Sequence, residues 1–177
     1  MKTSIITAVL SVAFLVSCQG PADNTQNNQE TFEQHVADFK SHFLEGFASK
    51  NLELQHQFFA DSVQWSGPTD LLNQSKGKAE LMEVIAYYHE HFDNIEFTDG
   101  AYYGGSLYST EETSDSPDNI RIYGNWKSTH KASGKQVLHK WYAFMSFDKD
   151  GRVYQINDWF NVSGIPLQVS GELVVEE

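Results

Sequence analysis

Apolar side chains recur every three or four residues in two stretches of the chain, which is the period of an amphipathic helix. In the first stretch the apolar positions are Phe32, Val36, Phe39, Phe43 and Phe47. This spacing predicts a helix over about 31–49, with a possible capping box formed by Thr31 and Gln34 at its start. A second helix is predicted over 78–92, and a short helical piece over 51–59 follows the first.

After Asp93 the pattern changes to stretches rich in β-branched and aromatic residues, which favour strands. These stretches cover 95–108, 120–130, 137–147 and 153–161, and turn sequences such as "KASGK" and "DKDG" separate them. A short strand is predicted earlier, over 61–67. Helices followed by a series of antiparallel strands predict an α+β domain with the helices on one face of the sheet.

The two middle strands can be aligned on each other from the sequence. A two-residue turn at Ser133-Gly134 would place Trp126 opposite Trp141 and put His139 on the same, mostly apolar face. The other face is mostly polar, which is the contrast that specifies register. It also carries three aromatic residues, Tyr123, Tyr142 and Phe144. They predict either a homodimer surface on the outer sheet face or simple cross-strand packing.

The N-terminus has the features of an export signal. Lys2 is followed by an apolar run of about a dozen residues, which is shorter than the roughly 20 that a membrane-spanning helix needs. The sequence "LVSC" at 15–18 resembles a bacterial lipobox, and Cys18 is the only cysteine of the chain. We therefore expect a lipoprotein signal peptide at 1–17 and lipidation of Cys18, which would anchor the protein to a membrane of the bacterial cell envelope. A plain signal peptide with a chance cysteine is the alternative.

The remaining segments differ in composition. Residues 18–30 carry almost no large apolar side chains and predict a flexible tether. Residues 31–166 are expected to form one domain, with a C-terminal tail at 167–177. Removal of 1–17 takes away Lys2 and leaves 11 Lys and Arg against 24 Asp and Glu, a net charge of −13. Such an acidic chain is not expected to bind nucleic acid, because phosphate contacts need clusters of cations.

Three segments, in this order and spacing, resemble the SnoaL-like branch of the nuclear transport factor 2-like superfamily. They are "FFADSVQWSGP", "KGKAELMEVIAYY" and "FDKDGRVYQINDWFNVSG". The resemblance implies a curved antiparallel sheet of four long strands plus one short strand, wrapped around about three N-terminal helices to form a cone with a pocket. It also implies that Asp158, on the last strand, corresponds to the carboxylate that acts as acid or base in SnoaL-like cyclases. A β-bulge would be needed for both Val153 and Asp158 to point inward.

His139 and Asp158 are therefore the candidate catalytic residues, and an Asp–His pair would suit proton transfer. The simpler interpretations are a core histidine and a solvated carboxylate. Candidate ligand-binding residues are the aromatic side chains Trp65, Tyr88, Tyr102, Trp126, Trp141 and Trp159, which otherwise are ordinary core residues. The sequence "HEH" at 89–91 does not place two histidines on one helix face, so we expect no metal. No cofactor motif is present in the sequence.

Three functions follow from these observations. The first is a lipid-anchored envelope protein whose domain binds a small, largely apolar molecule. The second is a metal-free acid–base enzyme of the same fold, such as an isomerase, dehydratase, cyclase or epoxide hydrolase. The third is a non-catalytic dimeric interaction module. Two titratable groups that converge in a cavity would favour the enzyme, whereas a cavity walled by carbon would favour binding.

Overall fold

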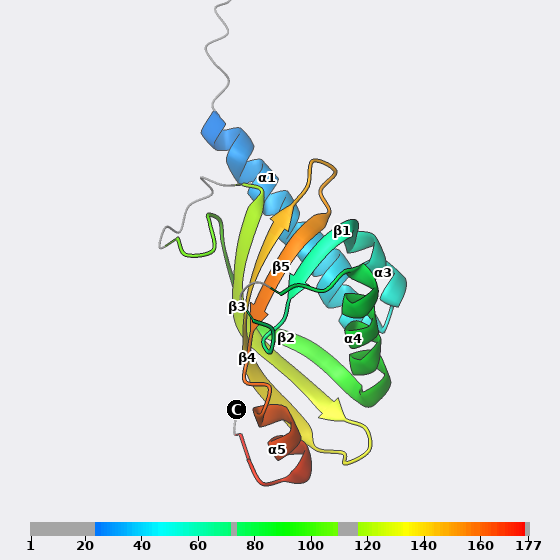
Figure 1. Ribbon diagram of the computed structural model, residues 1–177. Coiled ribbons are helices and arrows are strands. Elements are labelled where there is room, and N and C mark those ends of the chain that lie inside the picture. The colour runs from blue at the N-terminus through cyan, green and yellow to red at the C-terminus, as the bar shows by residue number, and fades with distance from the viewer. Residues whose placement is uncertain (1–23, 72–73, 110–116, 176–177) are drawn as a thin grey trace, which may run out of the picture.

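The computed structural model describes residues 24–71, 74–109 and 117–175, so the expected signal peptide and Cys18 lie outside the described residues. The protein has the predicted α+β class (Figure 1). Its elements in chain order are α1 (Asn24–Asp38), the π-helix η1 (Phe39–Leu44), α2 (Glu45–Ser49), α3 (Leu52–Phe58), β1 (Phe59–Ser66), α4 (Lys78–His91), β2 (Phe92–Tyr103), β3 (Asn119–His130), β4 (Gln136–Phe147), β5 (Val153–Trp159) and α5 (Gly164–Ser170). Within the described ranges, no helix has both the length and the apolar character that crossing a bilayer requires.

The first helical segment runs unbroken from α1 through η1 to α2. It already extends from Asn24, so Thr31 lies inside the helix, where its hydroxyl donates to the carbonyl of Asn27 rather than forming a capping box. In η1 the backbone N–H of Glu45 donates to the carbonyl of Lys40, five residues earlier. Side chains four apart drift by about 40° around a regular α-helix. The wider π-turn reduces that drift, which keeps the phenylalanines of this segment on the face toward the sheet.

The helical segment ends where the sequence predicts. Lys50 adopts the left-handed conformation, with φ of 55°, and the N–H of Asn51 donates to the carbonyl of Gly46. The side chain of Asn51 then accepts from the N–H groups of Glu53 and Leu54 and so caps α3. The chain thus reverses between α2 and α3 within three residues, and α3 packs back against η1.

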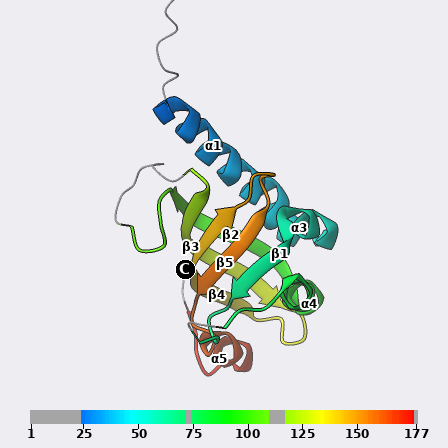
Figure 2. The same ribbon diagram turned by 45° about the horizontal axis from the view of Figure 1, so that its top comes forward.

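The five strands form one curved sheet in the order β1-β5-β4-β3-β2. Strands β2 to β5 pair antiparallel, as predicted, whereas the short strand β1 pairs parallel with β5. Strands β2, β3 and β4 each have 12 residues, but β5 has only seven because the chain leaves the sheet after Trp159. Helices α3 and α4 lie on one side of the sheet (Figures 1 and 2).

The main core lies between this side of the sheet and the N-terminal helices. Its fully buried members come from both layers and include Phe39 and Phe59 beside Ile120, Ile122 and Met145. Burying one such side chain stabilises the fold by roughly 1.5–3 kcal/mol. The predicted helix periodicity is therefore explained by a layer of helices that covers the inner face of the sheet.

The predicted register of β3 and β4 is wrong by two residues. Trp126 lies opposite His139, and Trp141 lies opposite Gly124. The hairpin has a longer loop than predicted, because Gly134, at φ of 68°, donates its N–H to the carbonyl of His130 and closes a wider turn. A shift of two residues leaves every side chain on its predicted face. For this reason His139 still points toward the inner side of the sheet.

Strand β5 contains the bulge that inward-pointing Val153 and Asp158 require. Phe147 pairs with Val153 and Ser146 with Gln155, so Tyr154 is the extra residue. Tyr154 is exposed, whereas Val153, Ile156 and Asp158 are buried. The bulge therefore brings all three buried side chains to the same face of the sheet.

Helix α5 begins before the expected boundary at 166 and continues into the segment expected to be a tail. Its Gln168 is 5% exposed and pairs with the backbone of Leu138 on β4 through two hydrogen bonds of 2.9 Å. These bonds provide partners for the backbone N–H and carbonyl of Leu138, which would otherwise be unpaired because β5 has already ended at this point of β4. At the other end of the domain, α1 similarly extends into the range expected to be a tether.

On the outer face of the sheet four aromatic rings form a continuous row, one from each of β2 to β4 and one from the end of β5. Tyr103 contacts Tyr123, Tyr123 stacks on Tyr142 at 4.7 Å, and Tyr142 stacks on Trp159 at 5.1 Å between ring centroids. Phe144, predicted to belong to this outer cluster, is buried. We refer to Tyr103, Tyr123, Tyr142 and Trp159 as the outer aromatic row.

Candidate functional site

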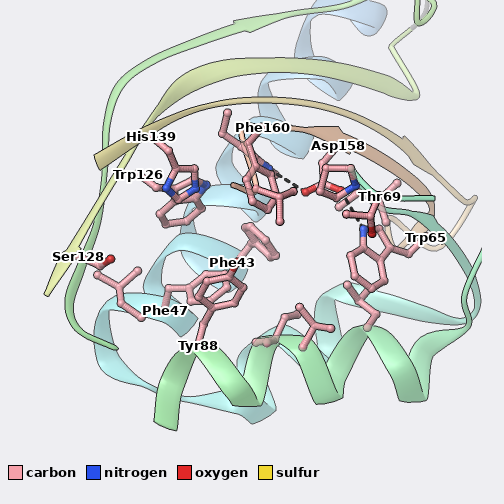
Figure 3. Close-up of a pocket in the computed structure, with 18 residues that line it drawn as sticks. Phe43, Phe47, Trp65, Thr69, Tyr88, Trp126, Ser128, His139, Asp158 and Phe160 are labelled. Carbon is pink, nitrogen blue, oxygen red and sulfur yellow. Dashed lines mark hydrogen bonds between the residues drawn. The ribbon is translucent and has the colours of Figure 1, made fainter. Parts of the chain in front are cut away.

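A cavity of about 200 Å³ lies between the inner face of the sheet and the helices (Figure 3). Its walls come from η1, α2, α4, β1 to β5 and the segments after β1 and β5. Seven lining residues are aromatic: Phe43, Phe47, Trp65, Tyr88, Trp126, Trp141 and Phe160. Seven are aliphatic: Pro68, Leu81, Val84, Ile85, Ile95, Ile156 and Val162. Only Thr69, Ser128, His139 and Asp158 add side chains of marked polarity, so the cavity is mostly apolar.

Asp158 is held in the cavity wall by two tryptophans. The indole Nε1 of Trp65 donates to its Oδ1 at 2.9 Å, and the Nε1 of Trp141 donates to its Oδ2 at 3.0 Å. The parallel pairing of β1 with β5 brings Trp65 opposite Ile156, two residues from Asp158 on the same face. Trp141 comes from β4 on the other side of β5. Each carboxylate oxygen therefore accepts one hydrogen bond, Oδ1 from a tryptophan of β1 and Oδ2 from a tryptophan of β4.

The environment of Asp158 changes its acidity. The residue is 8% exposed, and no cation of the described part of the chain forms an ion pair with it. Burial raises the pKa of the Asp158 carboxyl above its ordinary value, and the hydrogen bonds from Trp141 and Trp65 offset part of that rise. A carboxyl group in this position can release or take up a proton nearer to neutral pH than a solvated one.

His139 also lines the cavity, but it does not pair with Asp158. Its ring lies 5.1 Å from that of Phe160, and its Nδ1 is buried without a hydrogen-bond partner among the described residues. In Figure 3 both residues lie on the sheet side of the cavity, and Phe160 lies between His139 and Asp158. Burial lowers the pKa of His139 to about 4, so its ring is neutral at pH 7. The predicted Asp–His pair is therefore not formed in this arrangement.

Tyr88, on α4, faces the cavity from the side opposite the sheet (Figure 3). Burial raises the pKa of its hydroxyl to about 12, and the negative charge of Asp158 adds to this effect. Trp126 and Trp141 contact each other with ring centroids 5.8 Å apart. The structure therefore places Trp65, Tyr88, Trp126 and Trp141 in the cavity wall, as the sequence suggested for them.

Two of the suggested ligand-binding residues lie elsewhere. Tyr102 packs on Phe39 at 5.9 Å, with the ammonium group of Lys40 over its ring, and does not line the cavity. Trp159 belongs to the outer aromatic row. Neighbouring residues of a strand point to opposite faces, so an inward Asp158 directs Trp159 outward. The same alternation, applied at the sequence level, would have separated these two residues.

The sequence-based selection missed several lining residues. Phe43 and Phe47 were recognised as the apolar face of the first helix but not as part of a cavity. Phe160 follows the inward Asp158 by two residues, so alternation was a usable signal for it. Nothing in the local sequence distinguishes Thr69 or Ser128, because their place in the wall depends on how the segment after β1 and strand β3 are packed.

Comparison with known proteins supports the fold. No protein family profile and no curated protein matches the sequence. Among solved structures, the chain is similar to a candidate polyketide cyclase from Xanthomonas campestris, with a TM-score of 0.62 and 12% identity over 80% of this chain and 98% of the other. It is also similar to a candidate isomerase from Bacillus subtilis, with a TM-score of 0.59 and 16% identity over 85% and 99% of the two chains.

A third similar structure is a nuclear transport factor 2-like protein of unknown function from Burkholderia pseudomallei, with a TM-score of 0.58 and 17% identity. That likeness covers 79% of this chain and 98% of the other. Identities this low bear on architecture alone. The curved sheet, the layer of helices and these likenesses show that the chain adopts the nuclear transport factor 2-like fold, as its sequence resemblance predicted.

Proposed function

We propose that this protein binds a small, largely apolar ring compound in the cavity between the helices and the inner face of the sheet. The observation that carries the proposal is the cavity itself: about 200 Å³, lined mostly by aromatic and aliphatic side chains, with one buried carboxylate in its wall. An apolar cavity of roughly 150 Å³ in a protein is large enough to bind benzene. The site therefore suits a molecule of one ring with a short substituent, or of two fused rings.

The walls also favour a flat ligand. Trp126 and Trp141 meet at an interplanar angle of 67°, and Phe43 lies nearly parallel to Trp141 at 6.1 Å. Such ring faces and edges give a planar molecule both stacked and edge-on contacts. The polar groups, His139 and Asp158, lie apart on the sheet side with Phe160 between them, so they can orient the ligand without forming a proton relay between them.

The binding proposal is tested on the full chain, purified in detergent from its own host and measured by native mass spectrometry and tryptophan fluorescence. We expect a retained small molecule, or saturable quenching by added 2-phenylethanol. Val84→Phe, which adds bulk to the cavity wall, should weaken binding at least tenfold, and Glu83→Phe, at an exposed neighbouring position, should change it less than twofold. Absence of both a retained molecule and saturable quenching would contradict the proposal.

A second candidate is metal-free acid–base catalysis, and the burial of Asp158 favours it. The raised pKa of this carboxyl and its contact with the cavity fit a group that moves a proton on a bound ring compound. The names of the similar structures from Xanthomonas campestris and Bacillus subtilis, a candidate cyclase and a candidate isomerase, agree with this kind of chemistry. Asp158 would act alone, because His139 lies apart from it.

Proton transfer can be measured directly with 2-tetralone in deuterated buffer, by following deuterium incorporation next to the carbonyl with NMR. Catalysis by Asp158 predicts exchange faster than in buffer, and loss of the excess rate in Asp158→Asn while the ketone still binds. Exchange at the buffer rate with the ketone bound would leave the protein as a binding protein only.

The proposal includes attachment to the cell envelope through lipid on Cys18. The basis for this is the sequence alone: a charged start, a short apolar run and "LVSC" at 15–18. A lipid tether would hold an acidic domain, with a net charge of −12 for the full chain, at a membrane surface that its charge does not favour. Self-association through the outer aromatic row is a further part of the proposal, supported by the exposure of Tyr123 and Trp159.

A further inference from the structure

Asp158 is the only acidic side chain in the described residues that is buried, and it forms no ion pair there. A carboxylate offers about four acceptor positions. The indoles of Trp65 and Trp141 use two of them, one on each oxygen. Because Asp158 also lines the cavity, further acceptor positions remain for a ligand. A buried carboxylate without a cation is unfavourable, so the site gains when a positive charge enters beside it.

The surrounding rings favour the same kind of ligand. Trp65, Trp126, Trp141, Tyr88, Phe43 and Phe160 line the cavity, and the faces of such rings attract cations. Trp65 already shows this property, because the ammonium group of Lys76 lies 4.8 Å from the centre of its ring. That lysine is paired with Asp70 and does not line the cavity. Burial is the largest influence on the pKa of the Asp158 carboxyl, and the charge of Lys76 lowers that pKa by a smaller amount.

Nothing among the described lining residues opposes a cation. They include neither Lys nor Arg, and His139 is neutral at pH 7 because burial holds its pKa at about 4. The net charge of −12 attracts cations to the protein and repels anions. A carboxylate ligand would meet Asp158 without a compensating positive group.

We infer that the ligand of this cavity is an organic monocation, in which a protonated amine or quaternary ammonium group lies next to Asp158 and an apolar ring fills the rest of the space. This inference rests on the proposed function, that the cavity binds a small apolar compound, and adds the charge of that compound. The indoles orient the carboxylate, Asp158 supplies the countercharge, and the aromatic walls replace the water that the cation loses.

Three probes with the same phenyl ring separate charge from shape: 2-phenylethylamine, 2-phenylethanol and phenylacetate. Their affinities for the full chain in detergent are measured by calorimetry at pH 7 and low ionic strength. We expect the amine to bind at least ten times more tightly than the alcohol, and phenylacetate at least ten times more weakly than the alcohol. If the alcohol binds as tightly as the amine, the inference fails and the binding proposal survives. If none of the three binds, both fail.

Two variants locate the effect. Asp158→Asn should remove the preference and bring the affinity for the amine to within twofold of that for the alcohol. Asp61→Asn removes the same formal charge from an exposed position on β1 and should leave the tenfold preference intact. Loss of the preference in Asp61→Asn would assign it to the overall charge and overturn the role of Asp158. Should Asp158→Asn not fold, the ranking of the three probes on the unchanged protein decides the matter.

Discussion

The indole nitrogen of Trp65 lies 2.9 Å from the carboxylate of Asp158, although the two residues are 93 positions apart in the chain. The contact exists because the first strand of the sheet pairs parallel with the last. It joins the first and the last strand of the sheet through one hydrogen bond at the cavity wall. The stability of the fold and the chemistry of the cavity therefore depend on the same pair of residues.

Loss of the Trp65 donor should weaken the protein. In Trp65→Phe the Oδ1 of Asp158 loses its partner inside the fold, and a lost hydrogen bond to a buried charged group costs about 1.5–3 kcal/mol. Urea unfolding should show a decrease of this size in the free energy of unfolding. Trp159→Phe only replaces the indole that stacks on Tyr142 by a smaller ring, so it should change the free energy of unfolding by under about 1 kcal/mol. Equal losses in the two variants would argue against a special role for the Asp158 contact.

His139 should make stability depend on pH. Its pKa is about 4 in the folded protein, below the ordinary value of 6.5 in the unfolded chain, so the unfolded state binds more protons between these values. The contribution of the neutral ring is therefore complete above about pH 6.5 and is lost as the pH falls toward 4. The difference amounts to about 3.4 kcal/mol at most, taking 1.36 kcal/mol for each pKa unit.

The measurement is the free energy of unfolding at several pH values between 7 and 4. His139→Gln should flatten the curve relative to the unchanged protein. His56→Gln, at an exposed position on α3, should leave it as it was. If the free energy of unfolding depends on pH in the same way for His139→Gln and the unchanged protein, the imidazole is exposed to water rather than buried.

Lipidation should depend on Cys18. In Cys18→Ser the sulfur that would carry the lipid is missing, so the protein should lose the mass of the acyl groups and move from the membrane fraction to the soluble fraction. Mass spectrometry and fractionation in the native host report both changes. Ser11→Ala, within the apolar run, serves as the control. A Cys18→Ser protein that stays in the membrane fraction at its usual mass would exclude this anchor.

The outer aromatic row should mediate self-association. Tyr123 and Trp159 are 40% and 39% exposed, which leaves ring edges in the row open to a second copy of the chain. Tyr123→Glu should convert a dimer into a monomer in sedimentation experiments, because it buries a charge in the contact. Tyr154→Glu, on an equally exposed tyrosine of the β5 bulge, should not. A monomeric unchanged protein would rule the contact out.

Periodicity determined much of the secondary structure before any tertiary contact was considered. The phenylalanines of the first helix and the apolar positions of α4 have helical spacing, and the strands alternate, because each element buries one face. His139 was placed on the inner face correctly even though its strand was paired two residues out of register. Side chains along a strand alternate with a period of two. An error of two residues therefore keeps each side chain on the correct face of the sheet but assigns it the wrong partner on the neighbouring strand.

The sequence alone could not determine which residues contact each other in the folded protein. The hairpin register depended on the hydrogen bond that closes the turn at Gly134. The first helix begins in a polar segment with few apolar side chains, so periodicity gave no signal for its start. Tyr102 and Trp159 looked like cavity residues by composition, but the packing of Tyr102 on Phe39 and the alternation of β5 took them elsewhere.

The sequence by itself determined the α+β class, the inner and outer faces of the strands and the presence of a carboxylate near the end of the last one. These features follow from local periodicity and from a few contiguous motifs. Only the tertiary structure decided that Asp158 meets Trp65 and Trp141 rather than His139. That outcome depends on a one-residue bulge in β5 and on the parallel pairing of β1 with β5, and both are set by contacts between segments far apart in the chain.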